Sequence, residues 1–340
     1  MSESLISSEI DFEAEGKHTG FLRLPHSVHR SAYGRILIPI VMLKNGSGPT
    51  TLLMAGNHGD EYEAQIALSK LSRELEAEDI QGRLIILPMA NFPAAQAGTR
   101  TSPIDGGNLN RSFPGDPHGT PTEMIAHYIE EDLFPMCDYF FDFHSGGSSL
   151  YYPATLLRGL GHSPEESAKL IELQAAFDAP YAWVFTSGGG RASTARTAMG
   201  GGNRKGAITL MAELGGGGAV TPEILALTER GIKRLLHSTG MLPAYVPDAA
   251  IGTRELMVAD TIIAYDNGIF EPYCGIEDEV KKGDAAGAIH FPDTPWTPPV
   301  TLVFQHSGMV LCKRVPGLVE RGDCLFQIAK SLERAGLHTG

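Results

Sequence analysis

Hydrophobic positions between residues 35 and 240 follow two alternating patterns. Short runs rich in Ile, Leu and Val or in aromatic residues predict strands, and between them apolar residues recur at helical spacing. The predicted strands cover residues 35–41, 50–55, 83–88, 138–143 and 207–214, and the predicted helices cover residues 64–75, 122–134, 165–177 and 222–239. Strands separated by helices predict an α/β fold, with a mainly parallel mixed sheet covered by helices on both faces.

The pattern changes near residues 243–247. From residue 250 onward the chain has short β-like runs, such as 261–264 and 300–304, with frequent Gly and Pro and no helical spacing. We therefore expect two domains, an α/β domain over residues 1–245 and a small all-β domain over residues 246–340.

Composition excludes several classes of function. The chain has 340 residues with 27 Lys and Arg against 40 Asp and Glu, and it has no basic cluster for nucleic acid or an acidic membrane surface. Its first 16 residues lack the apolar segment of a signal peptide, and no apolar run is long enough to cross a membrane. The four cysteines fit neither a disulfide framework nor a thiolate zinc site. We therefore expect a soluble cytoplasmic protein.

Candidate metal ligands follow two of the predicted strands. His58 and Glu61 come after residues 50–55 at a spacing that places both on one side of a helix start, and His144 follows residues 138–143. Ligands in open parallel sheets bind beyond the carboxyl ends of the strands, so these side chains should meet. Two His and one carboxylate form the ligand set of a catalytic zinc.

The spacing His-x-x-Glu is weak evidence by itself, because it also occurs at His127 and His162. His127 falls inside a predicted amphipathic helix, and Pro164 interrupts the segment after His162. Only His58 stands at a strand end between glycines. The alternative for His58 is a loop histidine beside a glutamate that favours the helix dipole.

Further polar residues lie near the carboxyl ends of the predicted strands. Asp142 points to the same side of its strand as His144, where it would orient His58 or His144, or be satisfied by backbone donors. Glu213 ends an apolar strand, where a carboxylate needs a partner, and beside a metal-bound water it would be a general base. The segment 100–111 carries Arg100 and Arg111, whose guanidinium groups suit carboxylates, although a solvated loop explains it equally well.

Four motifs in this order resemble one family. They are Gly-Asn-His-Gly-Asp-Glu at 56–61, Asn-Leu-Asn-Arg-Ser-Phe-Pro-Gly at 108–115, Asp-Phe-His-Ser-Gly-Gly at 142–147 and Glu-Leu-Gly-Gly at 213–216. Together they resemble the succinylglutamate desuccinylase/aspartoacylase family, zinc amidohydrolases with a carboxypeptidase-like catalytic domain. The resemblance implies hydrolysis of a small N-acyl amino acid.

The same resemblance implies a role for each candidate residue. One zinc ion would be held by His58, Glu61 and His144, and the general base would be Glu213. The substrate carboxylate would be bound by Asn110 and Arg111, and the oxyanion would be stabilised by Arg100.

The C-terminal part resembles the β domain of the same family, which is related to biotinyl and lipoyl folds of the barrel-sandwich type. Gly283-Asp284 and Gly322-Asp323 are similar to its turns, but the turn 306–309 lacks the lysine of a true carrier. This resemblance implies a wall or lid for the site, or a contact between copies of the chain in a homo-oligomer.

The sequence leaves the chemical nature of the substrate's side chain undetermined. Residues 179–212 contain no acidic residue but include Arg191, Arg196, Arg204 and Lys205, which would favour an acidic or neutral substrate if they lined the pocket. The alternative is a solvated loop away from the site. A zinc carboxypeptidase and a metal-free binding module are the competing functions.

Overall fold

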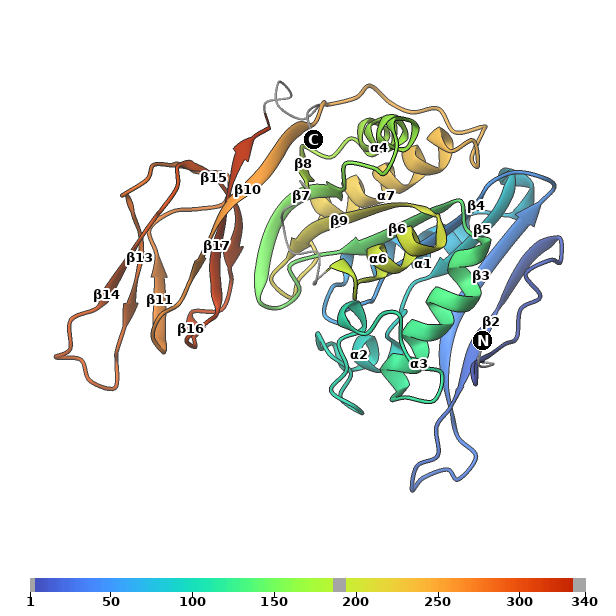
Figure 1. The fold of residues 1–340 in the computed structure, drawn as a ribbon, viewed down its shortest axis with the longest axis horizontal. Coiled ribbons are helices and arrows are strands. Elements are labelled where there is room, and N and C mark those ends of the chain that lie inside the picture. Colours follow the sequence, from blue (N-terminus) through green and yellow to red (C-terminus); the bar gives the residue numbers. More distant parts are fainter. Residues whose placement is uncertain (1–3, 186–193, 333–340) are drawn as a thin grey trace.

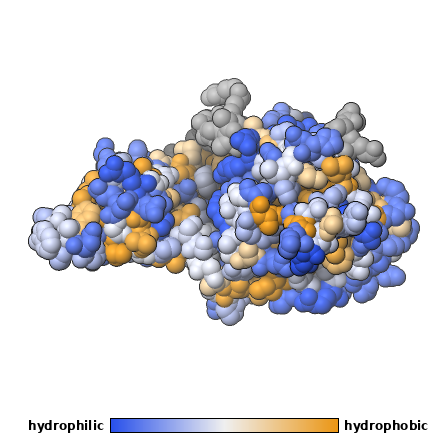
Figure 2. Space-filling view, turned by 90° about the horizontal axis from the view of Figure 1, so that it is seen from below, coloured by the Kyte–Doolittle hydropathy of each residue, from blue (hydrophilic) through white to orange (hydrophobic). Residues whose placement is uncertain are grey.

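The computed structural model describes residues 4–185 and 194–332. Figure 1 shows a larger body, in which helices pack on a twisted sheet, and a smaller β part that extends from one side of it. Hydrophilic residues predominate on the face of the larger body seen in Figure 2, in keeping with a net charge of −13. Among the described residues, no helix is both long and apolar enough to cross a membrane.

A large mixed sheet runs through the molecule. In spatial order its strands are β1 (Ser7–Ser8), β2 (Gly16–Pro25), β3 (Arg35–Asn45), β5 (Gly82–Leu87), β4 (Thr50–Met54), β6 (Tyr139–His144), β9 (Ile208–Gly216), β7 (Leu150–Arg158), β8 (Tyr181–Val184), β10 (Arg254–Ile263), β17 (Cys324–Ser331), β15 (Gly308–Arg314) and β12 (Glu279–Val280). The central strands β5, β4, β6 and β9 are parallel. β7 is antiparallel to β9, and β8 runs parallel to both β7 and β10.

Helices cover both faces of this sheet because each presents an apolar side to it. On one face, α1 (Glu63–Glu74), α4 (Pro164–Phe177) and α7 (Pro222–Ser238) bury residues such as Leu68, Leu173 and Leu235 against Phe141 and Phe143. On the other face, α2 (Phe92–Ala97), α3 (Pro121–Tyr128) and α6 (Ala198–Lys205) lie close to strands whose buried residues include Leu52 and Phe140.

Several boundaries differ from the sequence prediction. The predicted helix 122–134 is α3 followed by a π-helical turn, Ile129–Leu133, and a 3-10 turn, Phe134–Met136. The strands β2, β7 and β8 were not predicted. Pro153 interrupts the pattern of β7, and β8 has only four residues, so neither gives a clear alternation.

The C-terminal segment after residue 250 contains only β structure among its described residues. A second sheet has the order β14 (Val300–Val303), β13 (Ala285–His290), β11 (Gly268–Pro272) and β16 (Leu318–Val319). This segment has its own core around Phe270, Phe304 and Phe326. It also joins the main sheet, because β10 pairs with β8 and β15 pairs with β7. The four cysteines, Cys137, Cys274, Cys312 and Cys324, are free thiols, and Cys137 and Cys312 are buried.

Candidate active site

The turn between β4 and α1 brings His58 and Glu61 to the carboxyl edge of the sheet. The backbone passes so close to the next segment that a Cβ atom on Gly59 would lie 2.0 Å from the carbonyl carbon of Ala94. Only glycine fits there. This close packing fixes the path of the turn, so the motif needs a glycine directly after the histidine.

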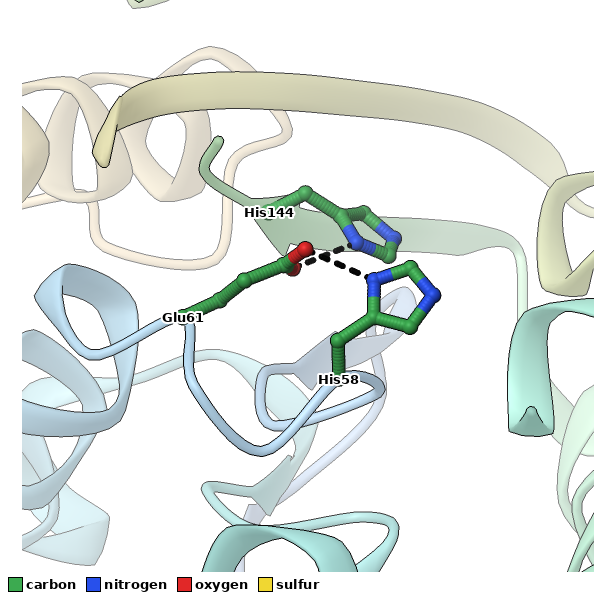
Figure 3. Close-up of side chains that lie close together, drawn as sticks. All are labelled: His58, Glu61 and His144. Atoms are coloured by element: carbon green, nitrogen blue, oxygen red, sulfur yellow. Dashed lines mark hydrogen bonds and ion pairs between the residues drawn. The ribbon is translucent and has the colours of Figure 1, made fainter. Parts of the chain in front are cut away.

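Glu61 lies between two imidazole rings (Figure 3). Its Oε1 is 2.7 Å from Nδ1 of His58 and its Oε2 is 2.8 Å from Nδ1 of His144. One potential ligand atom from each of the three residues lies within 4.8 Å of the others, and all three residues are buried. The structure therefore brings the three predicted ligands together in one cluster that can hold a metal ion.

Neighbouring groups orient both rings. Nε2 of His144 donates to Asp142 Oδ2 at 2.8 Å, and that oxygen also accepts from Asn57 Nδ2 at 3.1 Å. Nε2 of His58 lies 3.2 Å from Asn108 Oδ1. Asp142 therefore contacts His144. Its hydrogen-bond partners among the described residues are the side chains of His144 and Asn57, and not backbone N–H groups. Because Nε2 of His144 donates to a carboxylate, its Nδ1 atom keeps a lone pair that can bind a metal ion. This atom faces Glu61.

The buried carboxylates at the cluster favour a positive charge beside them. Burial by itself would lower the pKa of His144, but Asp142 and Glu61 raise that pKa well above 6.5. Burial would raise the pKa of Glu61, yet the two histidines lower it overall. The carboxylates are therefore neutralised by positive charge between them. The donor set of two imidazole nitrogens and a carboxylate oxygen fits zinc, which would supply that charge instead.

Glu213 stands beside the cluster. Its residue pairs directly with His144 in the register of β9 and β6, so both side chains lie on one face of the sheet. Burial first, and then the charge of Glu61, raise the pKa of Glu213 to about 8. Among the described residues its Oε2 has no hydrogen-bond partner. A carboxylate of this kind, next to a metal cluster, is suited to taking up and releasing a proton.

The candidate arginines and Asn110 face the same cavity. Arg100, with its side chain 46% exposed, places NH1 3.6 Å from Glu61 Oε1. Asn110 is buried and its Oδ1 accepts from the backbone N–H of Ala198 at 3.0 Å, which leaves its NH₂ group for a ligand. Burial, together with Arg100 and Arg196, lowers the pKa of Arg111. The two guanidinium groups lie close enough to repel each other, so an anion between them would be stabilised.

The cavity has a volume of about 710 Å³. Seven candidate residues line it, namely His58, Glu61, Arg100, Asn110, Arg111, His144 and Glu213. The lining also includes Met257 and Val258 of β10 and Gln327 of β17. Gln327 accepts a hydrogen bond from Tyr152 of β7 at 3.0 Å. The C-terminal segment therefore supplies part of the cavity wall.

Two buried carboxylates beside Glu61 were not assigned a role from the sequence. Asp60 Oδ2 accepts from both the N–H and the hydroxyl of Ser148 at 2.8 Å. Glu63 Oε1 accepts from the N–H of Gly216 at 3.1 Å. These bonds tie the start of α1 to the segments that follow His144 and Glu213. The sequence does show three acidic residues close together, at positions 60, 61 and 63. The hydrogen-bond partners of Asp60 and Glu63 come from distant segments and are seen only in the structure.

Two of the four basic residues in the acid-free segment are held elsewhere. Arg204 donates to both carboxylate oxygens of Glu130, at 2.9 and 2.7 Å, and Lys205 lies 2.7 Å from Glu131. Neither lines the cavity. Arg196 is exposed, and Arg191 lies outside the described residues. The two rejected His-x-x-Glu pairs also lie apart from the site, since His162 is exposed and Glu130 binds Arg204.

A mixed α/β sheet with a His-Glu-His cluster, an adjacent buried carboxylate and facing guanidinium groups defines a hydrolase of amide bonds. Residues 47–239 match the family described as the succinylglutamate desuccinylase/aspartoacylase catalytic domain, and the chain belongs to this family. It is therefore a deacylase, as its sequence motifs predicted.

Relatives match over nearly the whole chain. The N-alpha-acetyl-L-2,4-diaminobutyric acid deacetylase of Halomonas elongata is 42% identical over 98% of this chain and 97% of its own length. The product-bound ectoine utilisation protein EutE (DoeB) of Ruegeria pomeroyi superposes with a TM-score of 0.92 at 37% identity, covering 97% of this chain and all 100% of the other. A succinylglutamate desuccinylase/aspartoacylase of Rhodobacter sphaeroides has a TM-score of 0.90 at 38% identity, with coverage of 97% and 100%.

Proposed function

We propose that this chain is a zinc-dependent deacetylase of N-alpha-acetyl-L-2,4-diaminobutyrate. The observation that carries the chemistry is the pairing of Glu213 with a His-Glu-His cluster in one cavity. The likeness along 98% of the chain to the Halomonas deacetylase supports the choice of substrate. The product is a diamino acid and acetate.

The metal would be held by His58, Glu61 and His144, with Asp142 orienting His144. Zinc, when bound, supplies Lewis-acid activation of water and of the scissile carbonyl. The chain's own residues then account for positioning and proton transfer.

Glu213 is the proposed general base. Once ionised, its carboxylate takes a proton from the attacking water and delivers it to the leaving amine. Its enclosed position beside Glu61 raises its affinity for a proton, which suits it to both steps. Arg100 faces the cluster and would stabilise the developing oxyanion.

Arg111 and Asn110 are the proposed anchors of the α-carboxylate. A planar guanidinium and an amide N–H group can both donate to one carboxylate. Asn110 is fixed by its bond to Ala198, so the anchor is ordered before the substrate arrives. Holding the carboxylate places the amide bond toward the cluster, as orientation requires.

We also propose the two-domain division at residues 245 and 246, with a barrel-sandwich C-terminal domain. Two matching turns support it. Asp284 accepts from the N–H of Lys281 at 2.9 Å, and Asp323 accepts from the N–H of Glu320 at 2.8 Å. Each turn has its glycine in the left-handed region, Gly283 and Gly322, as in a repeated hairpin motif. The domain serves as a cavity wall, without a carrier lysine.

A substrate panel tests the proposed function. Zinc-loaded enzyme should release acetate from N-alpha-acetyl-2,4-diaminobutyrate faster than it cleaves N-acetyl-aspartate, N-succinyl-glutamate or a short peptide. Exclusive cleavage of the acidic substrates would assign the chain to an aspartoacylase or desuccinylase type, and peptide turnover would make it a carboxypeptidase. Absence of turnover with all four would leave a binding module.

A further inference from the structure

An N-acyl amino acid bound as proposed would divide the cavity into an acyl half and an amino-acid half. In an N-acyl amino acid, the α-carboxylate and the side chain are attached to the same carbon, next to the amide nitrogen. The carboxylate anchor therefore marks the half that receives the side chain. Because Asn110 bonds to Ala198 at the start of α6, this half lies on the α6 side of the cavity.

The sheet presents a row of side chains to the cavity on the face that α6 packs against. Asp142 pairs with Met211, Met211 with Leu157, and Leu157 with Trp183, from β6 across β9 and β7 to β8. Directly paired residues point to the same face of a sheet. Met211, Leu157 and Trp183 accordingly all line the cavity. They lead from the metal cluster to the wall that β8 forms.

An aromatic pair ends this row. Phe185 follows Trp183 by two residues and also lines the cavity. Their ring centroids are 4.8 Å apart and the rings are tilted by 52°. Met199 of α6 lines the same space. The ring surfaces are partly accessible, because both residues are only half-buried.

The part of the cavity wall formed by residues 183–185 carries no charged side chain. Among the described residues that line the cavity, the carboxylates are Glu61 and Glu213 and the arginines are Arg100 and Arg111. The wall at Trp183 carries neither sign, and Arg204 is held by Glu130. An acidic side chain placed against this wall would lose its water without receiving a cation from residues 183–185, while the described cation Arg196 acts on Arg111 at the carboxylate anchor. An ammonium group would meet the negative faces of two rings.

We propose that Trp183 and Phe185 form the binding site for the side-chain ammonium of the substrate and so determine its specificity. This proposal rests on the proposed function. Tryptophan is the strongest aromatic partner for a cation, and partial desolvation in a cavity strengthens the contact. The site distinguishes a diamino acid from an acidic one of similar length.

The test compares two ligands that differ in the ammonium group. 2,4-Diaminobutyrate and 2-aminobutyrate share the α-carboxylate and the carbon chain. Calorimetry on the zinc-loaded enzyme should show about tenfold tighter binding of 2,4-diaminobutyrate, the worth of a partly buried cation–π contact. Trp183→Leu should remove that gap and leave the affinity for 2-aminobutyrate within about twofold. Trp183→Phe should retain part of the gap.

A fluorescence measurement locates the contact. The chain has two tryptophans, and Trp296 is 80% exposed. In Trp296→Phe, the remaining indole is Trp183, so 2,4-diaminobutyrate should change its emission more than 2-aminobutyrate does. Trp296→Leu serves as the matched control in calorimetry and should keep the gap.

The outcomes separate the two proposals. An undiminished gap in both Trp183→Leu and Phe185→Leu, or no gap in the wild type, would overturn the aromatic site. If the gap is present but the wild type fails to hydrolyse N-alpha-acetyl-2,4-diaminobutyrate, the ammonium site stands and the proposed function fails.

Discussion

His144 and Glu213 are direct partners in the parallel register of β6 and β9. Adjacent strands lie about 4.8 Å apart, so register alone sets the proposed base beside the proposed metal ligand. A buried strand cannot slip by one residue against its neighbour without turning its own side chains to the opposite face. The separation of the proposed base from the proposed metal ligand is therefore set by the pairing of two buried strands.

The metal cluster gives the first prediction. Purified wild-type enzyme should carry about one zinc per chain, and both His58→Ala and His144→Ala should lower the content to near zero, because each removes one of three protein ligands. Elemental analysis after dialysis measures this. His162→Ala is the control, since it disrupts another His-x-x-Glu pair at an exposed position. Full metal content in both cluster variants would refute the assignment.

The proposed base gives the second. Glu213→Gln keeps the shape of the side chain but cannot accept a proton. Turnover should fall at least ~10²-fold, the usual lower worth of a positioned base, while zinc content stays at the wild-type level. Steady-state kinetics and elemental analysis on the same sample decide it. Near-normal turnover with zinc bound would show that another group takes the proton.

The central strands could be predicted from the sequence because they are buried on both faces. Residues 52–55 and 139–141 are short apolar runs, and the polar residues at and after the ends of their strands mark the edge where ligands bind. His58, Glu61 and His144 were identified this way, and the structure brings them together.

The far wall could not be predicted in this way. Pro153 and neighbouring tyrosines obscure β7, and β8 is too short to show a period. Tyr152 and Trp183 therefore had no predicted neighbours. Gln327 reaches the cavity only because β17 pairs with β10, a contact between strands more than 60 residues apart in sequence. Local pattern carries no information about such pairings.

The carboxylate anchor gives a third prediction. Arg111→Ala should raise KM at least ~30-fold, the cost of removing one partner of a hydrogen-bonded charge pair. Arg111→Lys should also impair binding, because it keeps the charge but loses the planar fork.

A change in the substrate, combined with Arg111→Ala, tests whether Arg111 contacts the α-carboxylate. Converting the α-carboxylate to an amide should harm the wild type about as much as Arg111→Ala does, and should add little in that variant. Arg35→Ala, at an exposed site, is the control. Additive losses from the two changes would mean that Arg111 binds something else.

Asp178 gives a prediction about stability and pH. It is buried in the left-handed region at φ 60°, after α4, and accepts from the N–H groups of Ile251 and Gly252 at 2.9 Å and from Arg230 at 3.0 Å. Burial would raise its pKa, but these donors lower the pKa below 3.8. Because the folded pKa is the lower one, the stabilisation is present above about pH 4 and is lost as pH falls.

Asp178→Asn should therefore lower the free energy of unfolding by about 1–3 kcal/mol at pH 7, and by less near pH 3. Asparagine tolerates the left-handed backbone, so the change isolates the charge. Denaturant unfolding at both pH values measures it. Asp248→Asn is the control, because Asp248 is 60% exposed although it also binds Arg230. A loss that stays constant down to pH 3 would contradict the account.

The most direct test of the whole account is a zinc titration of metal-free enzyme with N-alpha-acetyl-2,4-diaminobutyrate as substrate. Acetate release should rise in proportion to added zinc and level off at about one zinc per chain. Glu213→Gln should bind the same amount of zinc with little release of acetate. Turnover that is already maximal without metal, or that is as fast in Glu213→Gln, would contradict the account.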